Sequence, residues 1–114
     1  MLDPLSNNLN QYMTLVSVRQ KLVASNIANA DTPGYKTQDI DFESELQNAM
    51  HGGAAPLVSP VSGLRVKNDG NNVDLDREAR LLAENALRFS VASNLVRSQI
   101  KTIRMAIEGG TTAS

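Results

Sequence analysis

The last third of the chain carries an apolar repeat of seven residues, and this repeat constrains the fold more than any other feature of the sequence. It predicts a long C-terminal helix, because a heptad sustained from Leu75 to Ile107 is typical of a helix packed along another helix. Asp74 and Asp76 suit the start of this helix, and Gly109-Gly110 suit its end. The two columns of the repeat are Leu75, Leu82, Phe89, Val96, Ile103 and Ala79, Ala86, Ser93, Ile100, Ile107.

The N-terminal segment shows the same spacing over a shorter stretch. One column runs from Leu2 to Ala30, and the complementary column is interrupted by Arg19 and Asn26. Pro4 fits a first helical turn, with Asp3 as its cap. We therefore expect a mainly α fold, in which long N- and C-terminal helices form an antiparallel coiled-coil hairpin. The residues expected to pack the helices are Leu9, Tyr12, Val16, Val23, Leu82, Phe89, Val96, Ile100, Ile103 and Ile107.

The residues between the helices lack this periodicity. Residues 51–60 are rich in glycine and proline and predict a flexible loop. Asp69-Gly70 lies between short apolar runs, at residues 64–66 and 73–75, and favours one small β-hairpin at most. The predicted division is an N-terminal helix at 1–30, an irregular middle at 31–73, a C-terminal helix at 74–110 and a tail at 111–114.

The N-terminal helix is expected to end in a sharp turn. Asparagine at position 29 tolerates the left-handed conformation of a helix end, and a residue before proline is biased away from the helix. Pro33-Gly34 match the two central positions of a type II turn, which would direct an extended segment, residues 35–42, against neighbours. The residues assigned to this motif are Asn26, Asn29, Thr32, Pro33, Gly34 and Tyr35.

Composition argues against several classes of function. The 114 residues carry a net charge of -1 without a basic stripe, so nucleic acid is not an expected partner. No cysteine is present, and the one histidine, His51, is a loop residue rather than a metal ligand by this interpretation. No stretch has the length of a membrane span, and the first residues do not resemble a cleaved signal peptide. No catalytic or cofactor-binding arrangement is evident, so neither an enzyme nor a cofactor is expected.

Three polar features leave alternatives open. The alternating acids within residues 39–45 lack the glycine and distal glutamate of a calcium loop, which favours a solvated or interface-facing segment. Residues 69–72 could form a binding loop, although a hairpin turn explains them with fewer assumptions. Asn85 and Ser93, on or near the apolar face of the C-terminal helix, are either ordinary polar interruptions or residues that fix the register between helices.

Two stretches resemble a known family. The string NIANADTPGYK, residues 26–36, is similar to the motif that ends the N-terminal helix of bacterial flagellar rod, hook and hook-associated proteins. The opening residues and GNNVDLDREARLLAENALRF, residues 70–89, resemble the small proximal rod proteins of that family. The resemblance covers nearly the whole chain apart from residues 51–60. It implies a structural subunit of the periplasmic rod of the flagellar basal body, exported by the flagellar type III apparatus without a cleaved signal.

The resemblance also implies partners. Proximal rod proteins lie between the membrane-ring base, with its adaptor protein, and the other rod proteins. They polymerise through their terminal helices into a helical tube that transmits torque. The alternative class is a cytoplasmic helical adaptor or export chaperone, which would also carry amphipathic terminal helices. An adaptor should fold as a discrete monomer or dimer, whereas a rod subunit is expected to order its termini in the polymer.

Overall fold

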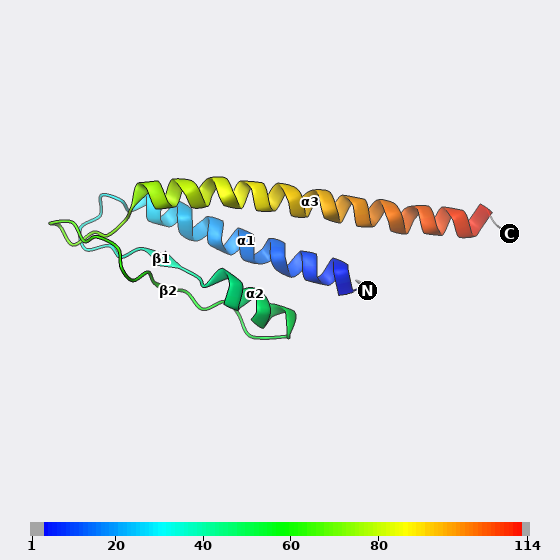
Figure 1. The fold of residues 1–114 in the computed structure, drawn as a ribbon, viewed down its shortest axis with the longest axis horizontal. Helices are drawn as coiled ribbons and strands as arrows, with labels where there is room; N and C mark the ends of the chain where they lie inside the picture. The colour runs from blue at the N-terminus through cyan, green and yellow to red at the C-terminus, as the bar shows by residue number, and fades with distance from the viewer. Residues whose placement is uncertain (1–3, 113–114) are drawn as a thin grey trace.

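The computed structural model describes residues 4–112, which form an elongated molecule of 73 × 26 × 17 Å. Helices α1 and α3 lie side by side and run in opposite directions, while α2 and the small sheet lie along the other side of α1 (Figure 1). The predicted fold class is thus confirmed, and α1 is the central element. In chain order the elements are α1 Pro4–Ala28, β1 Gln38–Asp39, α2 Phe42–Met50, β2 Ser59–Pro60 and α3 Leu75–Thr112.

The start of α3 follows its local sequence. The Asp74 carboxylate accepts hydrogen bonds from the backbone N–H groups of Asp76, at 3.0 Å, and Arg77, at 3.3 Å. These bonds satisfy amide groups that have no partner within the helix itself. For α1, helix begins at Pro4, and the predicted cap Asp3 lies outside the described residues.

The expected end of α3 at Gly109-Gly110 is wrong, because the helix continues to Thr112. Glycine ends a helix when it adopts a positive φ, and the described glycines with positive φ lie elsewhere in the chain. A glycine that keeps helical angles only weakens the helix, by about 1 kcal/mol relative to alanine.

The small sheet differs from the predicted hairpin. Strands β1 and β2 pair antiparallel, with Gln38 opposite Pro60 and Asp39 opposite Ser59. The sheet therefore joins the segment after the predicted turn to the end of the predicted flexible loop. The chain does reverse at Asp69-Gly70, but the residues flanking this turn form no strands in the described structure.

Helix α2 was not anticipated from the sequence. Asp41 caps it by accepting a hydrogen bond from the Ser44 N–H at 3.3 Å, and two glutamates occupy its first turn. Phe42, Leu46 and Ala49 follow the spacing of one helical face and pack against α1. The cap and this spacing are the sequence signals that would have identified the helix.

The apolar core lies between α1 and the arm formed by β1 and α2. Leu15 and Val16 of α1 pack there with Ile40 and Phe42. The Phe42 ring meets the Tyr12 ring edge to face, with centroids 5.6 Å apart. The partly buried residues around this core are Tyr12, Val18, Leu22, Leu46 and Ala49.

The contact between α1 and α3 is not the apolar seam predicted from the heptads. The α3 residues buried along α1 are Glu78, Asn85 and Ala92, which also recur every seven residues but are polar or small. Glu78 accepts a hydrogen bond from Asn26 of α1, and Asn85 donates one to Gln20 of α1, and these bonds favour the observed rotation of α3. Most of the large apolar residues in the two predicted columns are left at the surface. We call five of them the apolar stripe of α3, which comprises Leu82, Phe89, Ile100, Ile103 and Ile107.

A prediction concerns the core. Replacing Phe42 with alanine should lower the free energy of unfolding by about 3–5 kcal/mol, because it removes a buried ring between α1 and α2. Urea unfolding followed by circular dichroism measures the loss. The control is Leu57→Ala, at an exposed position, which should change the unfolding midpoint little. Equal midpoints for the two variants would show that Phe42 does not hold the arm to α1.

Candidate assembly site

The chain leaves α1 through a hydrogen-bonded turn. The Tyr35 N–H donates to the Thr32 carbonyl at 3.2 Å, and Gly34 between them has a φ of 75°. Proline followed by a glycine with positive φ is the type II arrangement that the sequence predicts. Before the turn, the Asn29 side-chain amide donates to the Ser25 carbonyl at 2.9 Å, which satisfies one carbonyl of the last helical turn.

A second turn packs against the first one. The Gly70 N–H donates to the Lys67 carbonyl at 2.9 Å, and the Lys67 N–H donates to the Asn71 carbonyl at 2.8 Å. Gly70 has a φ of 86°, and a Cβ atom placed on it would lie 3.3 Å from the Gly34 Cα atom. Glycine at position 70 therefore allows the two backbones to meet, and the Gly34 N–H donates to the Asp69 carbonyl at 2.9 Å.

Two buried asparagines join these turns with side-chain hydrogen bonds. The Asn71 amide nitrogen donates to the carbonyls of Asn29 and Thr32, each at 2.8 Å. The Asn72 side-chain oxygen accepts from the Thr37 N–H at 2.7 Å. These bonds replace the strand ladder that a hairpin would have formed, and they attach the segment before α3 to the end of α1.

The closed end of the helical hairpin is the end at which residues 29–74 connect α1 to α3. Asn26 lies at its centre, with 1% of its surface exposed. Its amide nitrogen donates to the Glu78 carboxylate at 2.8 Å and to the Gln38 carbonyl at 2.9 Å. Its oxygen accepts from the Tyr35 hydroxyl at 2.8 Å and from the Gln38 N–H at 3.0 Å. The side chain thus uses its full hydrogen-bonding capacity to join α1, β1 and α3.

A chain of alternating charges continues from Glu78. Arg77 donates to Glu78 at 2.7 Å and to Asp39 at 2.5 Å, and Arg19 donates to both oxygens of Asp39, at 3.1 and 3.0 Å. Burial acts to raise the pKa of Asp39, but the hydrogen bonds and charge of Arg19, with the Ile40 N–H and Arg77, bring it below its ordinary value of 3.8. We call Arg19, Asn26, Asp39, Arg77 and Glu78 the closed-end network.

The structure brings the motif residues to one end of the hairpin but differentiates their environments. Asn26 is buried, Asn29 and Tyr35 are half-buried, and Thr32, Pro33 and Gly34 are exposed. Of the residues expected to pack the helices, Val16 and Val23 are buried and Leu9, Tyr12 and Val96 are half-buried. The five residues of the apolar stripe are between 41% and 65% exposed, so within the subunit they are not packed as expected.

The polar partners of Asn26 were missed by reasoning from sequence. Arg19 and Asn26 interrupt an apolar column of α1, and the structure explains the interruption, because both are held by buried carboxylates. An unexpected polar residue on a helix face was the available signal. Asp39, the partner of Arg19, is 20 residues away along the chain, and Glu78, the partner of Asn26, is 52 residues away. Neither partner could be identified from spacing.

The other sites considered from the sequence show no set of metal ligands in the described residues. His51 is exposed, and its Nδ1 lies 2.7 Å from the Gln47 carbonyl oxygen. Within residues 4–112, no group of three or more histidine, aspartate or glutamate side chains is placed to hold a metal ion. Over the same range no helix combines the length and apolar character needed to cross a membrane.

A helical hairpin with a hydrogen-bonded closed end and an exposed apolar helix face is the arrangement expected of a structural assembly subunit. Comparison with known proteins agrees with this class. A family model described as flagella basal body rod protein matches residues 13–36, which include the turn motif. The flagellar basal body rod protein FlgB of Salmonella typhimurium is 36% identical, with the match covering 96% of this chain and 99% of the relative. FlgB of Escherichia coli K12 is 34% identical with the same coverage, and FlgB of Borrelia hermsii is 30% identical, covering 87% of this chain and 92% of the relative.

The chain belongs to the FlgB family of flagellar basal body rod proteins. It is accordingly a structural component of the flagellar basal body and not an enzyme.

Replacing Gly34 with valine should weaken the closed end. A β-branched residue with a positive φ costs roughly 1–3 kcal/mol of backbone strain, so the thermal midpoint should fall. The control is Gly109→Ala, because Gly109 lies in α3 without a positive φ and has open space around it. That change should leave the midpoint equal or higher. A Gly34→Val chain that melts like the parent would contradict the type II turn.

Replacing Asp39 with asparagine tests the charges of the closed-end network. At neutral pH the variant should lose on the order of 3 kcal/mol of unfolding free energy, because two partly buried arginines lose their shared carboxylate. The folded-state pKa of Asp39 is depressed, so its contribution is present above 3.8 and is lost as the pH falls through that lowered pKa.

The difference between the parent chain and Asp39→Asn should therefore be constant above 3.8 and shrink on further acidification. Urea unfolding across this pH range measures it, with the exposed Asp31→Asn as control. A difference that widens as the pH falls would reverse the assigned direction of the pKa shift.

Proposed function

We propose that this chain is a subunit of the proximal rod, which polymerises through its terminal helices and links the membrane-ring base to the rest of the rod. The observation that supports this most directly is the exposed apolar surface of α3. A monomer normally exposes large apolar side chains only in small patches, whereas here they line most of one long helix. Such a surface is suited to contact with neighbouring helices.

The rotation of α3 makes this surface available. Asn26 donates a hydrogen bond to Glu78, and Asn85 donates one to Gln20, so the polar column of α3 faces α1 while Leu82 and Phe89 of the apolar stripe stay exposed beside that contact. The rest of the stripe lies where α3 extends past the start of α1 (Figure 1). A helix pair that used its best apolar residues internally would have little left for the polymer. In this proposal α1 and α3 form the axial coiled-coil part of the subunit, and residues 31–73 make contacts outside it.

The closed-end network supports a role in carrying torque. Side chains from α1, β1 and α3 are joined there by charged and amide hydrogen bonds, which oppose sliding of one helix along the other. Packed helices also resist compression. Subunits of this kind, joined by contacts that do not close into a ring, would form a helical tube around the axis. The turn at Thr32–Tyr35 would place the following segment against neighbours.

Membership of the family supports two further parts of the proposal. The chain would reach the periplasmic rod through the flagellar type III export apparatus, without a cleaved signal. Its neighbours would be other rod proteins and the adaptor at the membrane-ring base. A cytoplasmic adaptor or export chaperone is the competing assignment. It predicts that complete rods form in cells that lack this chain.

The test changes the apolar stripe without changing the contact between α1 and α3. Ile100→Asp with Ile103→Asp should leave synthesis and export largely intact but prevent incorporation, because two charges would be buried in the assembled tube. Electron microscopy of purified basal bodies should then show membrane rings without a rod.

The matched control is Ser98→Asp with Thr102→Asp. It adds the same charge to exposed positions on the opposite face of the same part of α3, and it should assemble normally. Normal rods built from the isoleucine double variant would refute the stripe as an interface. Complete rods in cells that lack this chain would instead favour the adaptor or chaperone.

A further inference from the structure

The second half of α3 carries an excess of positive charge. Residues 85–107 contain four basic residues and no acid, although the whole chain has a net charge of -1. Arg97, Lys101 and Arg104 are exposed, and none of the ion pairs within residues 4–112 includes them. They follow one another at spacings of four and three residues, so they form one row along the helix. We call these three residues the basic row.

The basic row lies beside the apolar stripe. Ile100 of the stripe comes three residues after Arg97 and four residues before Arg104, so it is their neighbour on the helix surface. Ile103 and Ile107 continue the apolar face, and both are exposed. This part of α3 is therefore a basic amphipathic helix, with aliphatic side chains on one face and cations along one flank of that face.

The cations and the aliphatic face share one surface. The basic row borders a shallow hollow of about 440 Å³ together with Ile100, Met105 and Glu108. Glu108 is the one acid among these six residues, so the hollow is net positive. The other side of the helix is uncharged there, with Ser98 and Thr102 exposed and the Thr102 hydroxyl donating to the Ser98 carbonyl at 3.0 Å. That side is suited to contact with water.

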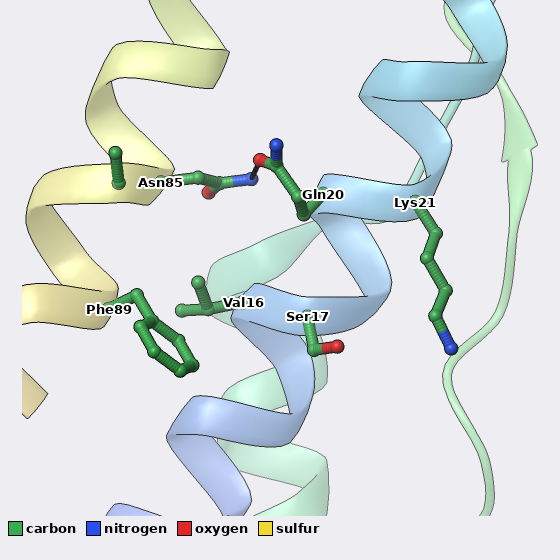
Figure 2. Close-up of a pocket in the computed structure, with 7 residues that line it drawn as sticks. Val16, Ser17, Gln20, Lys21, Asn85 and Phe89 are labelled. Atoms are coloured by element: carbon green, nitrogen blue, oxygen red, sulfur yellow. Dashed lines mark hydrogen bonds between the residues drawn. The ribbon is translucent and has the colours of Figure 1, made fainter. Parts of the chain in front are cut away.

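This surface lies beyond the part of α3 that packs against α1. Nearer the middle of α3, Asn85 bonds to Gln20 of α1, and the nearby cation of α1, Lys21, extends away from that contact (Figure 2). The pairing of Asn85 with Gln20 in antiparallel helices places Pro4, the first described residue of α1, opposite about residue 100 of α3. Helix α3 continues past that point and past the other described elements (Figure 1). Its end can therefore lie along a flat surface.

We propose that this end of α3, residues 97–107, binds the surface of an anionic phospholipid bilayer before neighbouring subunits cover it. The isoleucines enter the boundary between headgroups and acyl chains, and the basic row contacts the lipid phosphates. The helix lies on the bilayer rather than across it, since residues 4–112 contain no helix long and apolar enough to span one. This binding activity is separate from the proposed rod function and does not depend on it.

An anionic bilayer fits this surface better than the acidic arm of a second copy does. The acids of the arm do not form a matching row, and two of them are already engaged. Asp41 accepts a hydrogen bond from the Ser44 N–H at 3.3 Å, and the half-buried Glu45 accepts one from the Leu57 N–H at 3.3 Å. A bilayer needs no such register, because anionic headgroups cover its whole surface and attract basic residues close to it.

Vesicle flotation tests the contact. The purified chain should float with vesicles made of equal parts phosphatidylglycerol and phosphatidylcholine, and several-fold less of it should float with vesicles of phosphatidylcholine alone. High salt should lower the bound fraction, because it screens attraction between exposed charges. Equal binding to both kinds of vesicle, or binding to neither, would overturn the proposal. The vesicles contain no rod component, so this failure would leave the rod assignment intact.

Removing two charges of the basic row tests its part in the contact. Lys101→Gln with Arg104→Gln should lower binding to the anionic vesicles several-fold and leave the thermal midpoint unchanged, because both side chains are exposed. The control, Arg65→Gln with Arg80→Gln, removes the same charge from exposed positions near the closed end and should bind like the parent. Equal losses in the two variants would show that net charge alone matters, which would contradict a site on α3.

A single tryptophan identifies the face that meets the lipid. The chain contains no tryptophan, so Ile103→Trp introduces the only one. On binding, its fluorescence should shift to shorter wavelength and be quenched by brominated acyl chains, whereas that of Ser98→Trp, on the uncharged side, should change little. Binding that leaves Ile103→Trp unquenched would refute the apolar contact. A parent chain that binds soluble polyglutamate but not the anionic vesicles would instead identify an acidic protein as the partner.

Discussion

The side chain of Asn26 determines how the rest of the subunit is arranged. It is buried at the end of α1 and makes four hydrogen bonds, to Tyr35, to both backbone groups of Gln38 and to Glu78. These partners belong to the turn, to β1 and to α3. An aspartate could not donate to Glu78, and a leucine would leave the other polar groups buried and unpaired. The amide therefore fixes the turn, the sheet and the rotation of α3 together.

That rotation separates two kinds of packing. Between α1 and α2 the contact is apolar and includes Phe42, over whose ring the Arg88 guanidinium lies 4.8 Å from the centroid. On the α3 side, the residues buried against α1 are small or polar. The subunit thus keeps an internal core beside α2 and leaves the larger apolar side chains of α3 at its surface. An ordinary two-helix hairpin would have used both sets internally.

The sequence predicts the two long helices, their antiparallel pairing and the type II turn, because each depends on local or periodic signals. It does not predict which column of α3 faces α1. The heptads place apolar residues beside Glu78 and Asn85, and the ordinary preference for apolar seams selects the wrong column. The bonds of Glu78 to Asn26 and of Asn85 to Gln20 favour the observed rotation, and these join residues 52 and 65 positions apart. The predicted hairpin at Asp69-Gly70 failed for the same reason, since side-chain hydrogen bonds such as that of Asn72 with Thr37 hold this segment to distant residues.

The sequence separation of the bonds around Asn26 also sets an order of folding. Its bonds to Tyr35 and Gln38 span only 9 to 12 residues, so the end of α1 and its turn can become ordered as soon as this short stretch is free. The bond to Glu78 joins residues 52 positions apart, so closing that loop costs more entropy and comes later. The pairing of α1 with α3, which leaves the apolar side chains of α3 facing outward, can thus form only once both long helices are available.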